Sequence, residues 1–237
     1  MQRSIHTIKQ TLTPLFQGIL DLVYPPLCLV CEKKLVATED QLCDACLEGF
    51  KLLGKPHANF SVPGEVFIHT AWALFDFDPP FQQLIHHLKY SRRRKPILRV
   101  LNYFGREILD QLQGQAYDWI VSIPLHPRKR RERGYNQVDG VSEWLAENLH
   151  TQLGNQLVVC HKYTQSQTQL NAEERQENVS EAFGVKHETE IVGKRLLLVD
   201  DVLTTGATAN ALANILIATG ASRVDLLTLS TPSKGKP

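Results

Sequence analysis

The sequence lacks a long apolar segment, a strong net charge and internal repeats. No segment stays apolar for long enough to span a bilayer, which excludes a transmembrane helix. Because the formal net charge is only +1, any affinity for nucleic acid or phosphate has to come from local groups of cations. A chain of 237 residues, 43% of them hydrophobic, can nevertheless bury one full core and supply a small second module. We therefore expect one large domain and one small domain.

A secretory signal is also lacking. Polar residues such as Lys9, Gln10, Gln17 and Asp21 interrupt the start of the chain, so a cytoplasmic protein is expected. Apolar residues recur at helical spacing between Ile5 and Val23, which predicts an amphipathic helix that packs on the protein. Binding to a membrane surface is the less favoured alternative, because the polar face of this helix carries few cations.

Cysteine is scarce, but four of the five cysteines form two Cys-x-x-Cys pairs. Each pair can turn two thiolates toward one point, and four thiolates suit tetrahedral zinc. Two disulfides or a redox motif are the alternatives, but a chain without an export signal keeps its thiols reduced, and a redox motif needs only one pair. Structural zinc is therefore favoured, and its predicted ligands are Cys28, Cys31, Cys43 and Cys46. Cys160 lies alone in an apolar run and is expected in the core.

A connector rich in glycine and proline, Lys51–Glu65, follows the cysteine pairs. It divides the chain into an N-terminal helix with a zinc module at 1–53 and a main domain at 66–231. Strands are predicted in the main domain at 70–77, 119–123, 156–160, 196–199 and 224–229. Helices are predicted at 79–88, 96–112, about 137–149 and 208–219. Strands separated by helices predict an α/β fold with a mainly parallel, Rossmann-like sheet.

One strand of this sheet ends at two adjacent carboxylates. The apolar run Leu196–Val199 predicts a strand buried on both faces, and Asp200 and Asp201 follow it directly. An apolar helix is then predicted at 209–218, after the small residues Thr204, Thr205, Gly206, Ala207 and Thr208. Two carboxylates can accept hydrogen bonds from vicinal hydroxyls, while hydroxyls and backbone N–H groups at a helix N-terminus can hold a phosphate. Ribose 5-phosphate fits both halves, and an ordinary capped helix is the structural alternative.

Two basic segments are also present. One, Lys89–Lys95, ends the helix that begins at Pro79. The other follows the strand 119–123 as a predicted long charged loop, with cations at Arg128, Lys129, Arg130, Arg131 and Arg133. Its place at a strand end favours binding of phosphate or pyrophosphate, with Lys89, Ser122 and Pro124 as further candidates. The alternatives are a solvated loop and a contact with nucleic acid, for which Tyr90 and Tyr135 could serve as stacking platforms.

The segment Val199–Thr208 resembles the phosphoribosyl pyrophosphate (PRPP) loop of type I phosphoribosyltransferases. The segment Ser122–Gln137 is similar to the signature of the ComF/GntX family, proteins associated with competence for DNA uptake that carry a phosphoribosyltransferase domain behind a zinc finger. The cysteine pairs, Leu88–Tyr90 and Thr164–Phe183 share this resemblance, although Gln165-Ser166 stand where the family often has prolines.

The resemblance implies a type I phosphoribosyltransferase fold with a small zinc module. It assigns the ribose hydroxyls to Asp200 and Asp201 and the 5-phosphate to Thr204–Thr208. It also implies Mg²⁺ bound with PRPP, and pyrophosphate held by Ser122–Pro124 with Arg130 or Arg133. No general base or acceptor can be named.

The resemblance favours a PRPP-binding protein that supports DNA uptake by handling single-stranded DNA together with DNA-uptake proteins. Two alternatives remain open: a transferase that moves ribose 5-phosphate from PRPP to a nitrogen acceptor, and a PRPP sensor without turnover. Homodimerisation is also left open.

Overall fold

The computed structural model describes residues 25–36, 39–54, 56, 62, 64–90, 94–161 and 182–232. The chain divides into two compact units, Met1–Gly49 and Phe50–Pro237. The helix expected between Ile5 and Val23 and most of the segment Thr164–Phe183 lie outside the described residues. Across the described part of the chain, no helix combines the length and apolar character needed to cross a bilayer.

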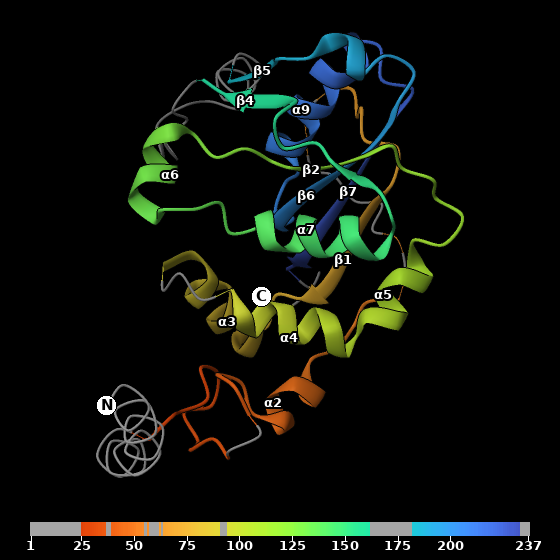
Figure 1. Ribbon diagram of the computed structural model, residues 1–237. Helices are drawn as coiled ribbons and strands as arrows, with labels where there is room; N and C mark the ends of the chain where they lie inside the picture. The colour runs from red at the N-terminus through yellow and green to blue at the C-terminus, as the bar shows by residue number, and fades with distance from the viewer. Residues whose placement is uncertain are drawn as a thin grey trace, which may run out of the picture. The chain divides into compact units, whose positions relative to one another are not determined.

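The main unit is built on a five-stranded sheet in the order β1-β7-β6-β2-β3 (Figure 1). Its strands are β1 (Ala71–Asp76), β2 (Trp119–Ser122), β3 (Gln152–Leu153), β6 (Arg195–Val202) and β7 (Arg223–Thr231). Every pair of neighbours in this sheet is parallel, which confirms the predicted α/β fold. The central strand β6 has Leu196–Val199 fully buried, as expected for a strand covered on both faces.

Helices cover both faces of this sheet (Figure 1). The helix α9 (Ala207–Ala218) packs on one face, and α7 (Asp139–Asn148) packs on the other. Beside α7 lie the helices α3 (Pro79–Tyr90), α4 (Lys95–Tyr103) and α5 (Gly105–Gln111). The helix α6 (Pro127–Arg133) follows β2, beyond the end of the sheet at which the ligand was expected.

The helix predicted at 96–112 is divided into α4 and α5. The chain leaves helical geometry at Phe104, whose φ and ψ are −94° and 13°. Gly105 follows, and a Cβ atom there would lie 3.2 Å from the ring of Trp144 on α7. A glycine at this point therefore lets the indole pack closely against the junction of the two helices.

The strand predicted at 156–160 is present as β4 (Val158–Cys160), but it lies outside the parallel sheet. It pairs antiparallel with β5 (Phe183–Val185), and β3 occupies the sheet edge instead. The chain turns at Gly154, where a Cβ atom would lie 2.9 Å from Leu157 and 3.0 Å from Val121. Gly154 permits this close approach, and after the turn β4 contributes Val158 to the apolar core, while its partner β5 contacts α9. Cys160, which was expected in the core, is only half-buried in β4.

The small unit contains the two Cys-x-x-Cys turns and α2 (Asp44–Gly49). An isolated antiparallel bridge joins Leu27 to Lys34 across the first turn. The carboxylate of Glu39 accepts hydrogen bonds from the backbone N–H groups of Val36 and Asp44, both at 2.9 Å. Backbone and side-chain hydrogen bonds of this kind hold the second turn at the start of α2.

Candidate functional site

The two adjacent carboxylates lie near the end of β6, and Val202 and Leu203 separate them from the small residues at 204–208. Thr204 and Thr205 are exposed, and Gly206 has a φ of 81°, which lies in the left-handed region that favours glycine. The helix α9 begins at Ala207, whose N–H donates to Oγ1 of Thr205 at 3.3 Å. Gly206 provides no side-chain cap, so the start of α9 offers backbone N–H donors to an anion.

Asp201 is held by two side chains from distant parts of the sequence. Its Oδ2 atom lies 3.0 Å from Nζ of Lys89, at the end of α3, and accepts a hydrogen bond of 2.7 Å from Nε2 of Gln137. Both Asp201 and Gln137 are buried, with exposed fractions of 7% and 4%. The sequence predicted sites for Asp201 and Lys89 but did not predict that they would pair.

The surroundings of Asp200 disfavour the charged form of its carboxyl group. Burial, followed by the negative charge of Asp201, raises the pKa of Asp200 to about 7. The backbone N–H of Asp201 donates to Oδ1 of Asp200 at 2.8 Å and favours the ionised form, as do the positive charges of Lys89 and Arg133, but these three do not offset the burial. The acid pair therefore contains one carboxylate in an ion pair and one whose protonation changes near neutral pH.

The basic segment after β2 is a helix, so the prediction of a long charged loop was wrong. Nδ1 of His126 accepts a hydrogen bond of 3.1 Å from the N–H of Arg128, and Pro127 occupies the first turn of α6. Gly134 ends the helix with a left-handed φ of 79°, and its N–H donates to the carbonyl of Arg130 at 2.7 Å. These N-terminal and C-terminal signals are sufficient to organise a short helix despite its charge.

The two basic segments are joined by cation–π contacts. The guanidinium of Arg133 lies 5.7 Å from the ring centre of Tyr90, and that of Arg94 lies 5.0 Å from the ring centre of Tyr135. The Tyr135 hydroxyl also donates to the carbonyl of Leu88. Tyr90 remains 64% exposed. Residues 91–93, which include two of the predicted cations, Arg92 and Arg93, lie outside the described residues.

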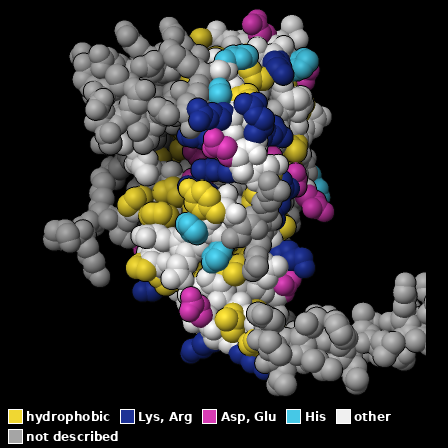
Figure 2. Space-filling model, turned by 90° about the vertical axis from the view of Figure 1, so that its left-hand side faces the viewer, with side chains coloured by type: hydrophobic (Ala, Val, Ile, Leu, Met, Phe, Trp, Pro, Cys, Tyr) yellow, Lys and Arg dark blue, Asp and Glu magenta, His cyan; other side chains and the backbone are white. Residues whose placement is uncertain are grey.

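Arg133 also connects α6 to the acid pair. It donates a hydrogen bond of 2.9 Å to Oε1 of Gln137, the same side chain that donates to Asp201. Figure 2 looks onto this face of the main unit, where Lys and Arg side chains gather with acidic side chains among them. Arg133 on α6, Gln137 and Asp201 on β6 thus belong to one connected polar network.

Ser122, at the end of β2, is buried. Its hydroxyl lies 2.8 Å from that of Ser142, and its backbone N–H donates to Oδ1 of Asn155 at 2.7 Å. Pro124 is half-buried two residues later. Asn136 donates to the carbonyl of Ile123 at 2.9 Å and fixes the chain after β2. The sequence motif Ser122–Gln137 contains Asn136 and Gln137, but the sequence analysis assigned them no role. The structure identifies them as functional candidates because both polar side chains are buried, which amino-acid composition does not indicate.

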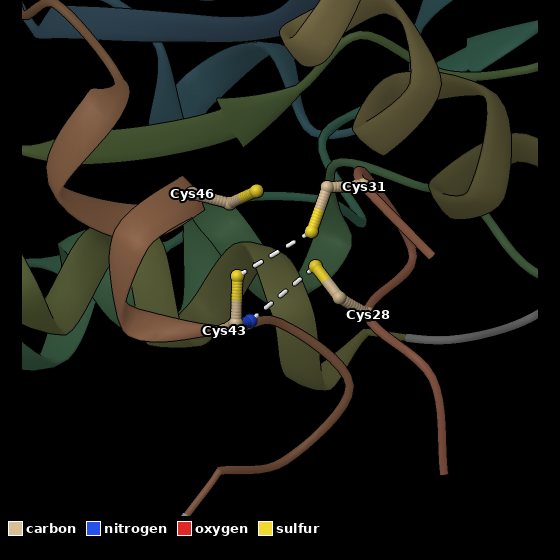
Figure 3. Close-up of side chains that lie close together, drawn as sticks. All are labelled: Cys28, Cys31, Cys43 and Cys46. Carbon is tan, nitrogen blue, oxygen red and sulfur yellow. Dashed lines mark hydrogen bonds between the residues drawn. The ribbon is translucent and has the colours of Figure 1, made fainter. Parts of the chain in front are cut away.

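The four cysteines of the two pairs converge in the small unit (Figure 3). Their sulfur atoms all lie within 4.8 Å of one another, and those of Cys31 and Cys43 are 3.6 Å apart. Four sulfurs bound at about 2.3 Å around a tetrahedral zinc ion would lie about 3.8 Å apart. All five cysteines of the chain are free, which agrees with a metal cluster and not with disulfides.

The environment of this cluster gives its thiols different acidities. Burial raises the pKa of Cys28, but N–H donors from Cys43, Cys31 and Val30 outweigh it and lower the value to about 7. Burial and the neighbouring sulfurs raise the pKa of Cys46. A bound cation would stabilise all four thiolates at once, so that the cysteines with a raised pKa would also lose their protons. The donor set therefore fits structural zinc.

Two family models match this chain, one near each end. A family model described as a double zinc ribbon domain matches residues 19–58, and one described as a phosphoribosyl transferase domain matches residues 138–237. Among solved structures, adenine phosphoribosyltransferase from Saccharomyces cerevisiae is 16% identical, with 74% of this chain and 83% of that chain covered and a TM-score of 0.36.

Two relatives are similar over nearly their whole length. The DNA utilization protein YhgH of Escherichia coli K12 is 30% identical over 221 residues, which cover 86% of this chain and 96% of the relative. Competence protein F of Haemophilus influenzae Rd is 26% identical over 215 residues, which cover 84% of this chain and 94% of the relative.

Proposed function

The chain belongs to the ComF/GntX family, represented by DNA utilization protein YhgH and Competence protein F, and on that premise we propose that its main unit binds PRPP where β6 leads into α9. The order of the groups carries the proposal. Asp200 and Asp201 lie near the end of β6, and Thr204–Thr208 pass through left-handed Gly206 into the start of α9. The carboxylates would accept hydrogen bonds from the ribose hydroxyls, and the N–H and hydroxyl groups of the loop would hold the 5-phosphate.

Lys89 is placed to take part without leaving Asp201. An ammonium group has three N–H donors, so Lys89 can keep its contact at 3.0 Å and donate to a pyrophosphate oxygen as well. Gln137 holds the other side of Asp201 and links it to Arg133. We propose that these two cations face the pyrophosphate, and that the acids face the ribose.

The donor set fits Mg²⁺ only together with the ligand. Mg²⁺ prefers oxygen donors and commonly binds through one or two carboxylates and substrate phosphates. Asp201 already has a cationic partner, so Asp200 is the acid of the pair that would supply a carboxylate to the metal. When bound with PRPP, Mg²⁺ would reduce the negative charge of the pyrophosphate.

Transfer of ribose 5-phosphate is the enzymatic form of this proposal. A nitrogen of the acceptor would form a bond to C1 of the ribose as the C1–O bond breaks and its electron pair leaves with pyrophosphate. Positive charge develops on the ribose ring, which the carboxylates of Asp200 and Asp201 can stabilise, while Lys89 and Arg133 stabilise the leaving group. A PRPP sensor would use the same contacts without an acceptor.

Handling of single-stranded DNA is a second candidate, supported by a different observation. The cation–π pairs Arg133–Tyr90 and Arg94–Tyr135 combine two separate basic segments into one surface. Cations beside aromatic rings suit a flexible strand, because they can contact phosphates while bases stack nearby. The names of the two relatives, which refer to DNA utilization and competence, favour the same candidate.

Calorimetry with PRPP and Mg²⁺ tests the first proposal. Replacing Asp200 and Asp201 together by Asn should weaken PRPP binding by more than about 100-fold, since the loss of each hydrogen bond to a charged group costs about 1.5–3 kcal/mol. Asp118→Asn is the control, because this half-buried acid pairs with Lys194 and not with the loop. Unchanged affinity in the double variant would refute PRPP binding here. If PRPP binds as proposed, release of pyrophosphate on addition of nucleobases would distinguish a transferase from a sensor.

A further inference from the structure

The helix α6 directs its cations to two different places. Arg133 contacts Tyr90 and Gln137, on the side of the acid pair. The other side of the helix is formed by residues three or four positions apart, namely Pro127, Arg130, Arg131 and Gly134, and it lines a groove. The helix α6 therefore contributes cations to two different surfaces, one on each of its sides.

The opposite wall of this groove is the β4–β5 hairpin. The hairpin residues that line it are Val159, Cys160, His161 and Lys186, and Pro124 and Leu125 line it beside α6. The groove has a volume of about 620 Å³, which lies within the range of small-molecule sites. None of the acids of the β6 pair and none of the small residues at 204–208 lines it.

The lining combines apolar and cationic groups, and among the described residues that form it there is no carboxylate. Arg130, Arg131 and Lys186 have solvent-accessible side chains, so their charged ends can reach a ligand. Pro124, Leu125 and Val159 offer apolar surface within the same groove. A ligand that complements both would carry a flat, largely apolar ring and a compact anion, because guanidinium groups bind phosphate oxygens in pairs.

A local packing feature fixes one side of the groove. Gly184 on β5 lies against the ring of His161, where a Cβ atom would be 2.7 Å from Nε2. The backbone N–H of His161 donates to the carbonyl of Ala182 at 2.7 Å, and that of Lys186 donates to the carbonyl of Leu157 at 2.8 Å. The hairpin thus holds His161 and Lys186 in place at the groove through its backbone.

From this arrangement we infer that the groove binds a nucleoside 5′-monophosphate, with the base against the apolar lining and the phosphate between α6 and Lys186. The inference goes beyond the proposed PRPP site and does not rest on it, because the groove is lined by neither the acid pair nor the loop 204–208. The nucleotide could be free or could be the 5′-phosphorylated end of a single strand, since both present the same groups.

The test uses the full chain and adenosine 5′-monophosphate (AMP), with affinity measured by calorimetry. Arg130→Gln with Arg131→Gln should weaken AMP binding by at least about tenfold. Arg128→Gln with Lys129→Gln is the matched control, because it removes two charges from α6 and changes no lining residue. It should change the affinity by less than about twofold. Gly184→Ala should also weaken AMP binding, because the added methyl group displaces His161.

AMP also carries the ribose hydroxyls and 5′-phosphate that the β6–α9 loop was proposed to bind, so one variant separates the sites. With Asp200 and Asp201 both replaced by Asn, the loop can no longer hold the ribose, yet AMP should still bind and should still be weakened by the Arg130 and Arg131 replacements. If that variant loses AMP while the Arg130 and Arg131 variant keeps it, AMP occupies the loop and the inference is overturned. The inference would also be overturned if AMP did not bind, or if the Arg130 and Arg131 variant lost no more affinity than the Arg128 and Lys129 control. Competition by 5′-phosphorylated but not by unphosphorylated oligodeoxynucleotide would identify a strand end as a source of the nucleotide.

Discussion

The ammonium group of Lys89 lies 3.0 Å from Oδ2 of Asp201 and joins the end of α3 to the end of β6. Their side chains are 23% and 10% exposed, so solvent screens this ion pair less than one on the open surface. The pair also determines the local charge, because Lys89 favours the ionised form of Asp200 as well. Asp200, Asp201 and Lys89 therefore form one group of three interacting ionisable side chains, which come from β6 and α3.

Replacing Lys89 by Met tests the coupling between these two residues. The variant should lower the melting temperature, and in a double-mutant cycle with Asp201→Asn the two changes should be non-additive by about 0.5–3 kcal/mol. PRPP affinity should also fall. Lys194→Met removes a more exposed ion pair with Asp118, also at 3.0 Å, and should leave PRPP affinity unchanged. Additive effects in the cycle would show that Lys89 and Asp201 act independently.

The pKa of Asp200 predicts a specific pH dependence of stability. The folded carboxyl keeps its proton up to about pH 7, whereas its ordinary pKa is 3.8. The folded state therefore binds more protons between these values, and the contribution of Asp200 to stability is lost as pH rises through this window. Asp200→Asn removes this loss, so the melting temperature of the variant relative to the parent should increase from pH 5 to pH 8.

Asp118 provides a control of opposite sign. Its pKa is lowered, chiefly by the backbone N–H of Arg195 and further by Lys194. It contributes stability above its ordinary pKa and loses this contribution as pH falls. Asp118→Asn should therefore cost more at neutral pH than in acid. A melting-temperature difference for Asp200→Asn that stays constant with pH would contradict the raised pKa.

Removing one cysteine of the cluster tests structural zinc. Protein purified without added zinc should contain about one zinc ion per chain, and Cys28→Ser should reduce that content together with solubility or the melting temperature, because metal binding supports folding of such modules. Cys160→Ser is the control and should keep its zinc, since Cys160 lies in the main unit. A zinc-free chain that remains folded and monodisperse would disprove the assignment.

The joined basic surface predicts how DNA affinity depends on salt. Replacing Arg94 and Arg133 by Gln should lower the slope of log affinity for single-stranded DNA against log salt concentration by about 0.7 for each phosphate that the surface no longer neutralises. Arg106→Gln on α5 removes an exposed charge elsewhere and should leave the slope unchanged. An unaltered slope in the double variant would mean that this surface does not follow a DNA backbone.

Local signals in the sequence were sufficient for the central part of the fold. The apolar run before Asp200 and the small residues after it predicted β6 and α9, because strand, turn and helix signals occur there in one continuous segment. The helix α6 was missed because its charges indicate solvation. Its N-cap is a histidine, and nothing in the residue order indicates that this side chain accepts the hydrogen bond.

Features that depend on distant residues could not be predicted in the same way. The antiparallel pairing of β4 with β5 joins two segments that are distant in the sequence, and the close approach of Gly154 to Leu157 and Val121 appears only once the chain is folded. The contacts of Asp201 with Lys89 and Gln137 arise only when α3 and the chain before α7 meet β6. Residue types and spacing identified the members of the site, but tertiary packing determined their partners.

The order of the strands also affects how the protein is made. The first strand, β1, pairs in the sheet with the last, β7, and near their start the backbone N–H of Thr70 donates to Asp225, 155 residues further along the chain. A ribosome adding about 5–20 residues per second needs on the order of 8–30 s to cover that distance. During this time the apolar strand β1 is without its partner, so a newly made chain depends on completing translation, or on a chaperone, to avoid aggregation through that exposed edge.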